Sequence, residues 1–204
     1  MHSEMPVYPG SEQPDFKIIH TVEKNGFRET KMTFDSHTGT HVDAPSHMIP
    51  GGLSLDTMNI AHFFGRATLL DFSGSPSQSI TLNDLKLYQE TIRKVDFVIL
   101  KTGWSQYWGK PKYDKDYPCL AEEAAHWLSG FKLRGIGVDA ISIDRADSTD
   151  FPVHKRFLSK NIMIIENLTN LARIKNEFFR FSIFPLKIKD VDGSPIRAIA
   201  IEGK

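Results

Sequence analysis

Cysteine is almost absent from this chain, since its 204 residues include only one, Cys119. A single cysteine cannot form an internal disulfide, which is typical of a reducing compartment and predicts a cytoplasmic protein. No base lies next to Cys119 in the sequence. We therefore interpret it as a small buried residue on a helix and not as a nucleophile.

The chain also lacks an excess of charge of either sign, because 25 basic and 25 acidic residues leave a formal net charge of +0. No concentrated basic patch is present, which argues against a nucleic-acid partner. No apolar run approaches the roughly 20 residues of a membrane-spanning helix. Residues 1–10 have neither the basic nor the apolar region of a signal peptide. These absences predict a protein without nucleic-acid or membrane partners.

What the chain does contain is an alternation of strand and helix patterns. The length favours a single domain over residues 1–204, and 40% hydrophobic residues suffice for a sizeable core. Two strand patterns, 16–23 and 27–35, flank Asn25-Gly26, a strong hairpin turn signal. Thr81 and Asp84 match a capping box that opens a helix through about Lys94.

The remaining elements follow from apolar runs and helical spacing. We predict strands at 66–72, 96–100, 135–138, 161–166, 178–188 and 196–201, and helices at 119–131 and 154–160. This alternation indicates an α/β fold with a β-rich N-terminal part.

The stretch from Ser36 to Gly52, SHTGTHVDAPSHMIPGG, carries the clearest chemical signal. It places His37, His41, Asp43 and His47 within eleven residues. Imidazole and carboxylate ligands together suit Zn²⁺ or Mn²⁺. A lone histidine in a turn would more simply be a solvated polar residue. Three histidines and an aspartate, separated by small or rigid residues, favour a metal site.

The spacing of His37 and His41 resembles the zinc helix H-E-x-x-H. Gly39 lies between the two histidines, however, and no glutamate is present, which excludes that motif. We therefore expect a rigid loop at the exit of a strand. Farther along, His154 and Glu166 each have an ordinary explanation, as a histidine at a helix start and a carboxylate at a strand end.

The histidine stretch fits the pattern H-x-G-T-H-x-D-x-P-x-H, which resembles the signature of the cyclase-type metal-dependent hydrolases. That family includes bacterial kynurenine formamidases and isatin hydrolases. The resemblance continues in order along nearly the whole chain, through MPVYPG (5–10), KTGW (101–104), GVD (137–139), HKRFL (154–158), IIENL (164–168) and DGSPIRA (192–198).

This resemblance implies roles for individual residues. His37, His41 and Asp43 correspond to metal ligands, with Asp43 able to bridge two ions. His154 and Glu166 correspond to the groups that complete a second metal position. The set would hold one or two Zn²⁺ or Mn²⁺ ions.

His47 corresponds to the catalytic acid/base of the family. The implied fold is a swivelling β/α/β barrel-like domain, assembled as a homodimer or homotetramer. The loop leading to His154 departs from the kynurenine formamidases, so that the resemblance implies their metal chemistry without their substrate.

The leading functional hypothesis is a metal-dependent hydrolase of a small amide, formamide or lactam, with metal-activated water and a histidine acid/base. A polyketide-type cyclase or dehydratase on the same fold is the first alternative. A non-catalytic metal-binding domain is the second, although structural zinc sites are usually rich in cysteine.

Three aromatic residues follow a Thr102-Gly103 break: Trp104, Tyr107 and Trp108. They form either an aromatic substrate pocket or a separate hydrophobic cluster.

Overall fold

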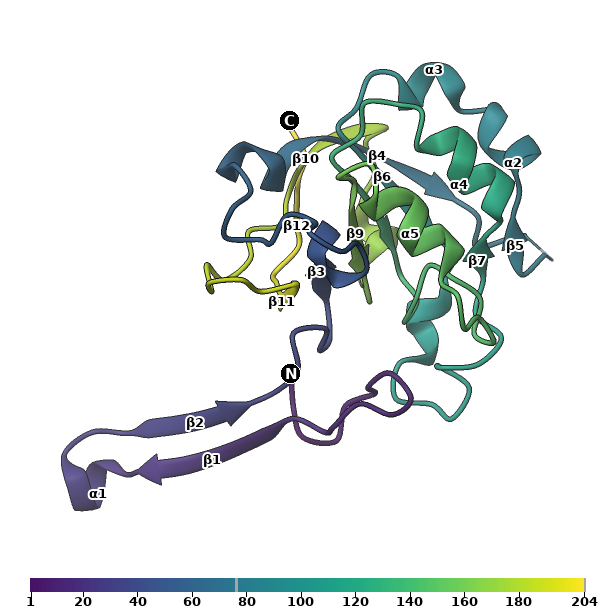
Figure 1. The fold of residues 1–204 in the computed structure, drawn as a ribbon. Helices are drawn as coiled ribbons and strands as arrows, with labels where there is room; N and C mark the ends of the chain where they lie inside the picture. The colour runs from purple at the N-terminus through teal and green to yellow at the C-terminus, as the bar shows by residue number, and fades with distance from the viewer. Residues whose placement is uncertain (76, 204) are drawn as a thin grey trace.

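An eight-stranded mixed sheet organises the protein, whose computed structural model describes residues 1–75 and 77–203 (Figure 1). The strand order is β11-β3-β9-β8-β6-β4-β10-β12. Four strands in the middle run parallel, and two strands on each side are antiparallel to their neighbours. The strands span His41–Asp43 (β3), Phe64–Asp71 (β4), Phe97–Lys101 (β6), Gly135–Val138 (β8), Met163–Glu166 (β9), Phe178–Ser182 (β10), Gly193–Pro195 (β11) and Ile199–Ile201 (β12).

The two edge strands are consecutive in the sequence, which requires the sheet to curl. Eight strands in a flat sheet would place β11 and β12 roughly 34 Å apart, given the spacing between paired strands. The chain from Pro195 to Ile199 spans at most about 14 Å. The sheet therefore curls into a half-barrel, which confirms the expected barrel-like α/β fold.

The two faces of the sheet are packed differently. Strand β6 alternates, so that Val98 and Leu100 join a cluster with the helices, whereas Phe97 and Ile99 join a second cluster with β10 on the concave face. Four helices cover the first face (Figure 1). The helices are α2 (Leu82–Lys86), α3 (Gln89–Ile92), α4 (Glu122–Leu128) and α5 (Pro152–Leu158). No helix among the described residues is long and apolar enough to cross a bilayer.

Several predicted elements differ from the observed ones. The helix predicted from 81 to 94 has its capping box at Thr81 and Asp84, but it is divided into α2 and α3 at Leu87 and Tyr88. The prediction that Cys119 lies on a helix is wrong. Cys119 and Leu120 form the short strand β7, which pairs in parallel with β5 (Ser79–Ile80), and α4 begins only at Glu122. Cys119 is buried, as expected.

The final strand predictions were too long. Strand β10 stops at Ser182, and Pro185 follows soon after, where it would remove a donor from the ladder. The strand predicted from 196 to 201 is observed only as β12, Ile199–Ile201, and the unpredicted strand β11 precedes it on the opposite edge of the sheet.

The predicted N-terminal hairpin projects from the body as an arm (Figure 1). It consists of β1 (Asp15–His20) and β2 (Glu29–Thr33), paired antiparallel. Its connection is not a two-residue turn. Val22–Asn25 forms a single helical turn, α1, which Gly26 ends in the left-handed conformation that favours glycine, with φ 78°.

Candidate metal centre

The pairing register of β3 assembles half of the site. His41 and Asp43 are two residues apart on one strand, so their side chains point to the same face, while Val42 points into the concave core. The antiparallel register with β9 places Glu166 directly opposite His41. The distances from His41 Nε2 are 3.2 Å to Asp43 Oδ1 and 3.5 Å to Glu166 Oε2.

This arrangement corrects the expectation of a strand-exit loop. His41 and Asp43 lie within a three-residue strand that pairs on both sides, with β9 and with β11. His37 precedes the strand in a turn, where Gly39 takes a positive φ of 68°. His47 ends a short 3₁₀ helix, Pro45–His47. The two outer histidines thus come from the segments on either side of a rigid strand.

His154 reaches the same cluster from α5. Its Nε2 atom lies 3.2 Å from Glu166 Oε1 and 3.5 Å from Asp43 Oδ2. Its Nδ1 atom lies 2.6 Å from Asp144 Oδ2. Asp144 also accepts the backbone N–H groups of Val153 and His154, at 3.0 and 2.9 Å. Asp144 therefore fixes both the start of α5 and the orientation of the His154 ring.

A second aspartate, Asp192, contacts the other two histidines. Its Oδ2 atom lies 2.9 Å from His37 Nε2 and 3.3 Å from His47 Nδ1. The opposite ring nitrogen of His37, Nδ1, lies 2.8 Å from Asp43 Oδ1. The His37 and His47 rings lie against each other with their centroids 3.9 Å apart. Asp192 precedes β11, the strand that pairs with β3.

The donor atoms form two groups that share Asp43. One contains His37, His41 and Asp43, and the other contains Asp43, His154 and Glu166; within each group the donor atoms lie within 4.8 Å of one another. A third group, His37, His47 and Asp192, meets the same criterion. The structure thus brings together all five residues expected to be ligands, with His47 beside them. Their roles as ligands stay a prediction.

The orientation of the rings suits a metal ion. His41 uses Nδ1 to contact the backbone oxygen of Gly39 at 2.7 Å, and His154 uses Nδ1 to contact Asp144, so that both rings direct Nε2 at the carboxylates. Ligand histidines in proteins are usually held in this way, by an acceptor on the nitrogen that does not bind the metal. Buried charged groups of this kind are costly unless they are paired or coordinate a metal.

The electrostatics of the cluster follow from burial and proximity. Burial lowers the pKa of His37, but its hydrogen bonds to Asp192 and Asp43 outweigh that effect and raise the pKa to about 10. Burial raises the pKa of Asp43, yet the neighbouring histidines, His41 first among them, hold it well below its usual value. Burial lowers the pKa of His47. His47 therefore differs from His37 in favouring the neutral form, which can accept a proton.

A cavity of about 270 Å³ opens onto the cluster. Its wall combines the cluster with apolar side chains from the N-terminal segment, from the 3₁₀ helix and from the loop before α5. The lining residues are Pro6, Val7, Tyr8, Ser11, His37, Gly39, His41, Asp43, His47, Met48, Ile141, Ser142, Phe151, His154, Glu166 and Asn167. The volume is suited to a small organic molecule.

The three aromatic residues proposed for a substrate pocket do not line this cavity. Trp104 and Tyr107 pack edge to face with centroids 4.8 Å apart, against the cluster of core residues beneath the helices. Trp104 Nε1 also donates to the Tyr113 backbone oxygen at 2.8 Å. Trp108 lines a separate, larger cavity. The placement of Trp104 and Tyr107 fits the hydrophobic-cluster alternative, whereas Trp108 is exposed.

Asp144, Asp192, Tyr8 and Asn167 were not identified from the sequence. Asn167 donates to the Gly39 backbone oxygen at 3.0 Å and accepts from the Tyr113 hydroxyl at 2.7 Å, which ties the turn before β3 to the neighbouring loop. Tyr8 and Asp192 lie within the MPVYPG and DGSPIRA segments, so the motifs marked their neighbourhood. No spacing signal connected residues so distant in sequence to the histidine cluster.

The chain is similar to known proteins over most of its length. The Cyclase family model, described as "Putative cyclase", matches residues 1–145. Kynurenine formamidase of Bacillus cytotoxicus is 30% identical over 200 residues, which cover 98% of this chain and 92% of that protein.

Two solved structures resemble the fold along nearly its whole length. One, titled a potential metal-dependent hydrolase with cyclase activity, has a TM-score of 0.82 and 30% identity, and the match covers 98% of this chain and 92% of that one. An isatin hydrolase bound to the product analogue thioisatinate has a TM-score of 0.89 over 99% of this chain and 89% of that one; its 23% identity speaks for the fold alone. From the family match and the full-length relative, this chain belongs to the cyclase family.

Proposed function

We propose that this protein is a metal-dependent hydrolase that opens the carbon–nitrogen bond of a small amide, formamide or lactam. The observation that carries the proposal is the pair of largely buried donor groups sharing Asp43, beside His47 and a cavity of small-molecule size. The relative named kynurenine formamidase and the neighbour titled a potential metal-dependent hydrolase support hydrolysis of a small amide with a divalent metal.

The metal would be held by His37, His41 and Asp43, and a second ion by Asp43, His154 and Glu166. Nitrogen and carboxylate donors without a cysteine suit Zn²⁺ or Mn²⁺. A bound divalent ion supplies Lewis acidity, which polarises a carbonyl oxygen and lowers the pKa of water from about 15.7 towards ~7.

The chain's own residues supply positioning and proton transfer. His47 lines the cavity, and its lowered pKa keeps a ring nitrogen available as a base. We assign it the removal of a proton from the attacking water and the return of that proton to the leaving amine. Proton transfer by a positioned group typically contributes about 10²–10⁴ to the rate. Val7, Ile141 and Phe151 add apolar surface to the wall of the cavity.

A cyclase or dehydratase activity is the second candidate, because one neighbour's title names cyclase activity. The mass of the product separates the two reactions. We expect incubation with an aryl formamide or a lactam in ¹⁸O-labelled water to yield a carboxylate product that has gained one labelled oxygen. A product with unchanged mass, or with one water fewer than the substrate, would assign the cyclase or dehydratase reaction. Metal binding without turnover of either substrate would favour a non-catalytic metal domain.

We further propose that the protein assembles as a homodimer or homotetramer through the hairpin arm. No residue of β1 or β2 is buried, and an isolated two-stranded hairpin is marginally stable in water. One face of the arm presents Phe16, Ile18 and Met32, and the opposite face presents Lys17 and Lys31. The apolar face therefore needs a partner surface.

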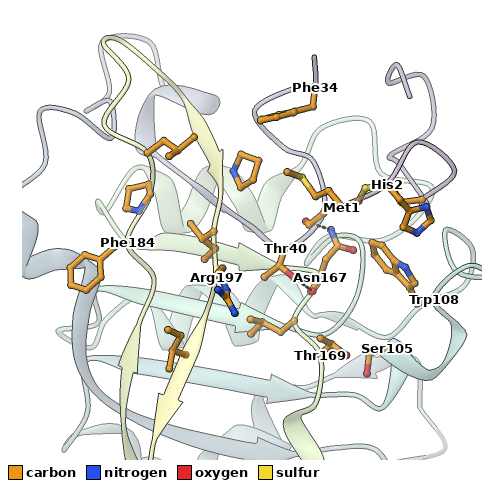
Figure 2. A pocket seen from close by; sticks show the side chains of 18 of the residues that line it. Met1, His2, Phe34, Thr40, Ser105, Trp108, Asn167, Thr169, Phe184 and Arg197 are labelled. Carbon is orange, nitrogen blue, oxygen red and sulfur yellow. Dashed lines mark hydrogen bonds between the residues drawn. The ribbon is translucent and has the colours of Figure 1, made fainter. Parts of the chain in front are cut away.

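Apolar side chains also gather near the base of the arm, where Figure 2 shows Phe34, Trp108 and Phe184 around a pocket. A cavity of about 950 Å³ is bordered there by Phe34, Trp108 and Phe184. The neighbouring edge strand β12 exposes Ile199 and Ile201. Exposed apolar surfaces of this extent usually mark interaction sites.

Replacement of Met32 by glutamate should disrupt the assembly. A carboxylate without a partner in an apolar interface carries a desolvation cost on the order of several kcal/mol. Sedimentation should therefore report the monomer mass for Met32→Glu. The neighbouring variant Lys31→Glu changes the opposite face of the same strand and should keep the wild-type mass. If both variants sediment like the wild type, the arm is not the contact.

A further inference from the structure

Asp192 is neither one of the five residues assigned to the metal nor the residue assigned to proton transfer, yet it contacts one of each. Its Oδ2 atom faces the Nε2 atom of His37 at 2.9 Å and the Nδ1 atom of His47 at 3.3 Å. One carboxylate oxygen therefore contacts both a residue assigned to the metal and the residue assigned to proton transfer.

Three contacts of the side chain and the backbone hold Asp192 in place. Ser36 Oγ donates to Asp192 Oδ1 at 3.0 Å, and the Asp192 backbone oxygen accepts from the Ala44 N–H at 2.8 Å. The next residue, Gly193, pairs with Asp43 in the register of β11 and β3. The position of Asp192 is therefore fixed relative to the strand that carries Asp43.

Gly193 shapes the same contact from the side of the backbone. A Cβ atom added at Gly193 would lie 2.5 Å from His37 Cε1 and 2.8 Å from His37 Nε2. Only glycine leaves room for the His37 ring there. Gly193 thus leaves space for the His37 ring, and the Asp192 carboxylate contacts the Nε2 atom of that ring.

We propose that Asp192 is a positioning residue that fixes the tautomers of His37 and His47 together. By accepting the Nε2–H of His37, it leaves Nδ1 to face Asp43 and the metal position. By accepting the Nδ1–H of His47, it leaves Nε2 as the nitrogen that takes the proton from water and returns it to the leaving amine. This inference rests on the proposed function, because it assigns the two histidines their metal and proton-transfer roles.

The arrangement also explains why the two histidines lie against each other. Their ring centroids are 3.9 Å apart, a separation that would oppose two positive charges. A single negative group bonded to both rings stabilises this contact. A carboxylate that holds a histidine in this way usually affects metal affinity or activity by about 10–100-fold.

Three variants in zinc-loaded protein test the proposal. Asp192→Ala removes the acceptor. Asp192→Asn keeps one oxygen toward the rings, with its amide facing the Ser36 hydroxyl. Asp190→Asn is a matched control on an exposed side chain two residues away. The readouts are the number of zinc ions bound per chain, the zinc affinity, kcat and KM, and the histidine tautomers from the ¹⁵N chemical shifts of the rings.

We expect Asp192→Ala to bind as many zinc ions as the wild type with an affinity lower by about 10–100-fold. The His47 ring should change from the Nδ1–H form to a mixture, and kcat should fall while KM changes little. Asp192→Asn should stay closer to the wild type than Asp192→Ala in zinc affinity, kcat and the His47 tautomer. The control Asp190→Asn should match the wild type.

The loss of one zinc ion per chain in Asp192→Ala would make Asp192 a ligand and overturn the proposal. Unchanged tautomers would overturn it as well. A wild-type protein that binds no divalent ion would refute the proposed function instead. The His47 tautomer, read in metal-free wild type and Asp192→Ala, would then decide the positioning claim separately.

Discussion

Replacement of Asp43 by alanine is expected to abolish both metal binding and hydrolysis. Asp43 is the one group shared by the two donor sets, and its side chain is 1% exposed at the centre of the cluster. Without it, each set loses a negatively charged ligand. The loss of several kcal/mol of transition-state stabilisation corresponds to a rate reduction of about 10³-fold or more.

Metal analysis of purified Asp43→Ala, together with kcat/KM, measures both effects. Because a cavity in the cluster could also unfold the protein, Asp43→Asn should be measured in parallel, since it keeps the side-chain volume. Circular dichroism establishes that each variant is folded. Asp147→Ala removes an exposed aspartate paired with Arg145 and should keep the wild-type metal content. A folded Asp43→Asn with a full complement of metal would show that Asp43 is not a ligand.

Replacement of His47 by alanine is expected to abolish activity as well, but this variant should retain its metal. His47 lines the cavity and belongs to neither donor set that contains Asp43. Removing a positioned acid/base typically lowers the rate by about 10²–10⁴-fold. Added imidazole should restore part of the activity of His47→Ala, because it supplies the missing base, and it should not rescue Asp43→Ala.

The pair of variants therefore separates the two roles. Equal metal loss in His47→Ala and Asp43→Ala would make His47 a ligand, as the group formed by His37, His47 and Asp192 would allow. Full activity of His47→Ala would transfer the proton-transfer role to another group at the cavity.

The sequence predicted the site better than it predicted the path of the chain around it. His41 and Asp43 are close in sequence, and the i, i+2 alternation of a strand is sufficient to bring them together. Glu166 reaches the same cluster only because β3 inserts antiparallel between β9 and β11. That pairing depends on tertiary contacts, so the resemblance to a known family was needed to connect His154 and Glu166 with the motif.

The residues that hold the histidines were beyond prediction for the same reason. Asp192 lies 155 residues from His37, and its contact depends on how the curled sheet brings β11 beside β3. Local signals also competed with each other. The histidine motif contains Gly39 and Pro45, which suggested a loop, whereas pairing on both sides holds residues 41–43 as a strand. The aromatic residues near Trp104 were ambiguous because both a pocket and a core attract such side chains.

The central claim, a metal-dependent hydrolase of small amides, is tested most directly by restoring activity to metal-stripped protein. Formamides, lactams and esters should be assayed without metal and after separate addition of Zn²⁺ and Mn²⁺. We predict no turnover without metal and hydrolysis of at least one formamide or lactam when one of the ions is added. Hydrolysis that persists at full rate in metal-free protein, or no hydrolysis of any substrate with either ion, would contradict the claim.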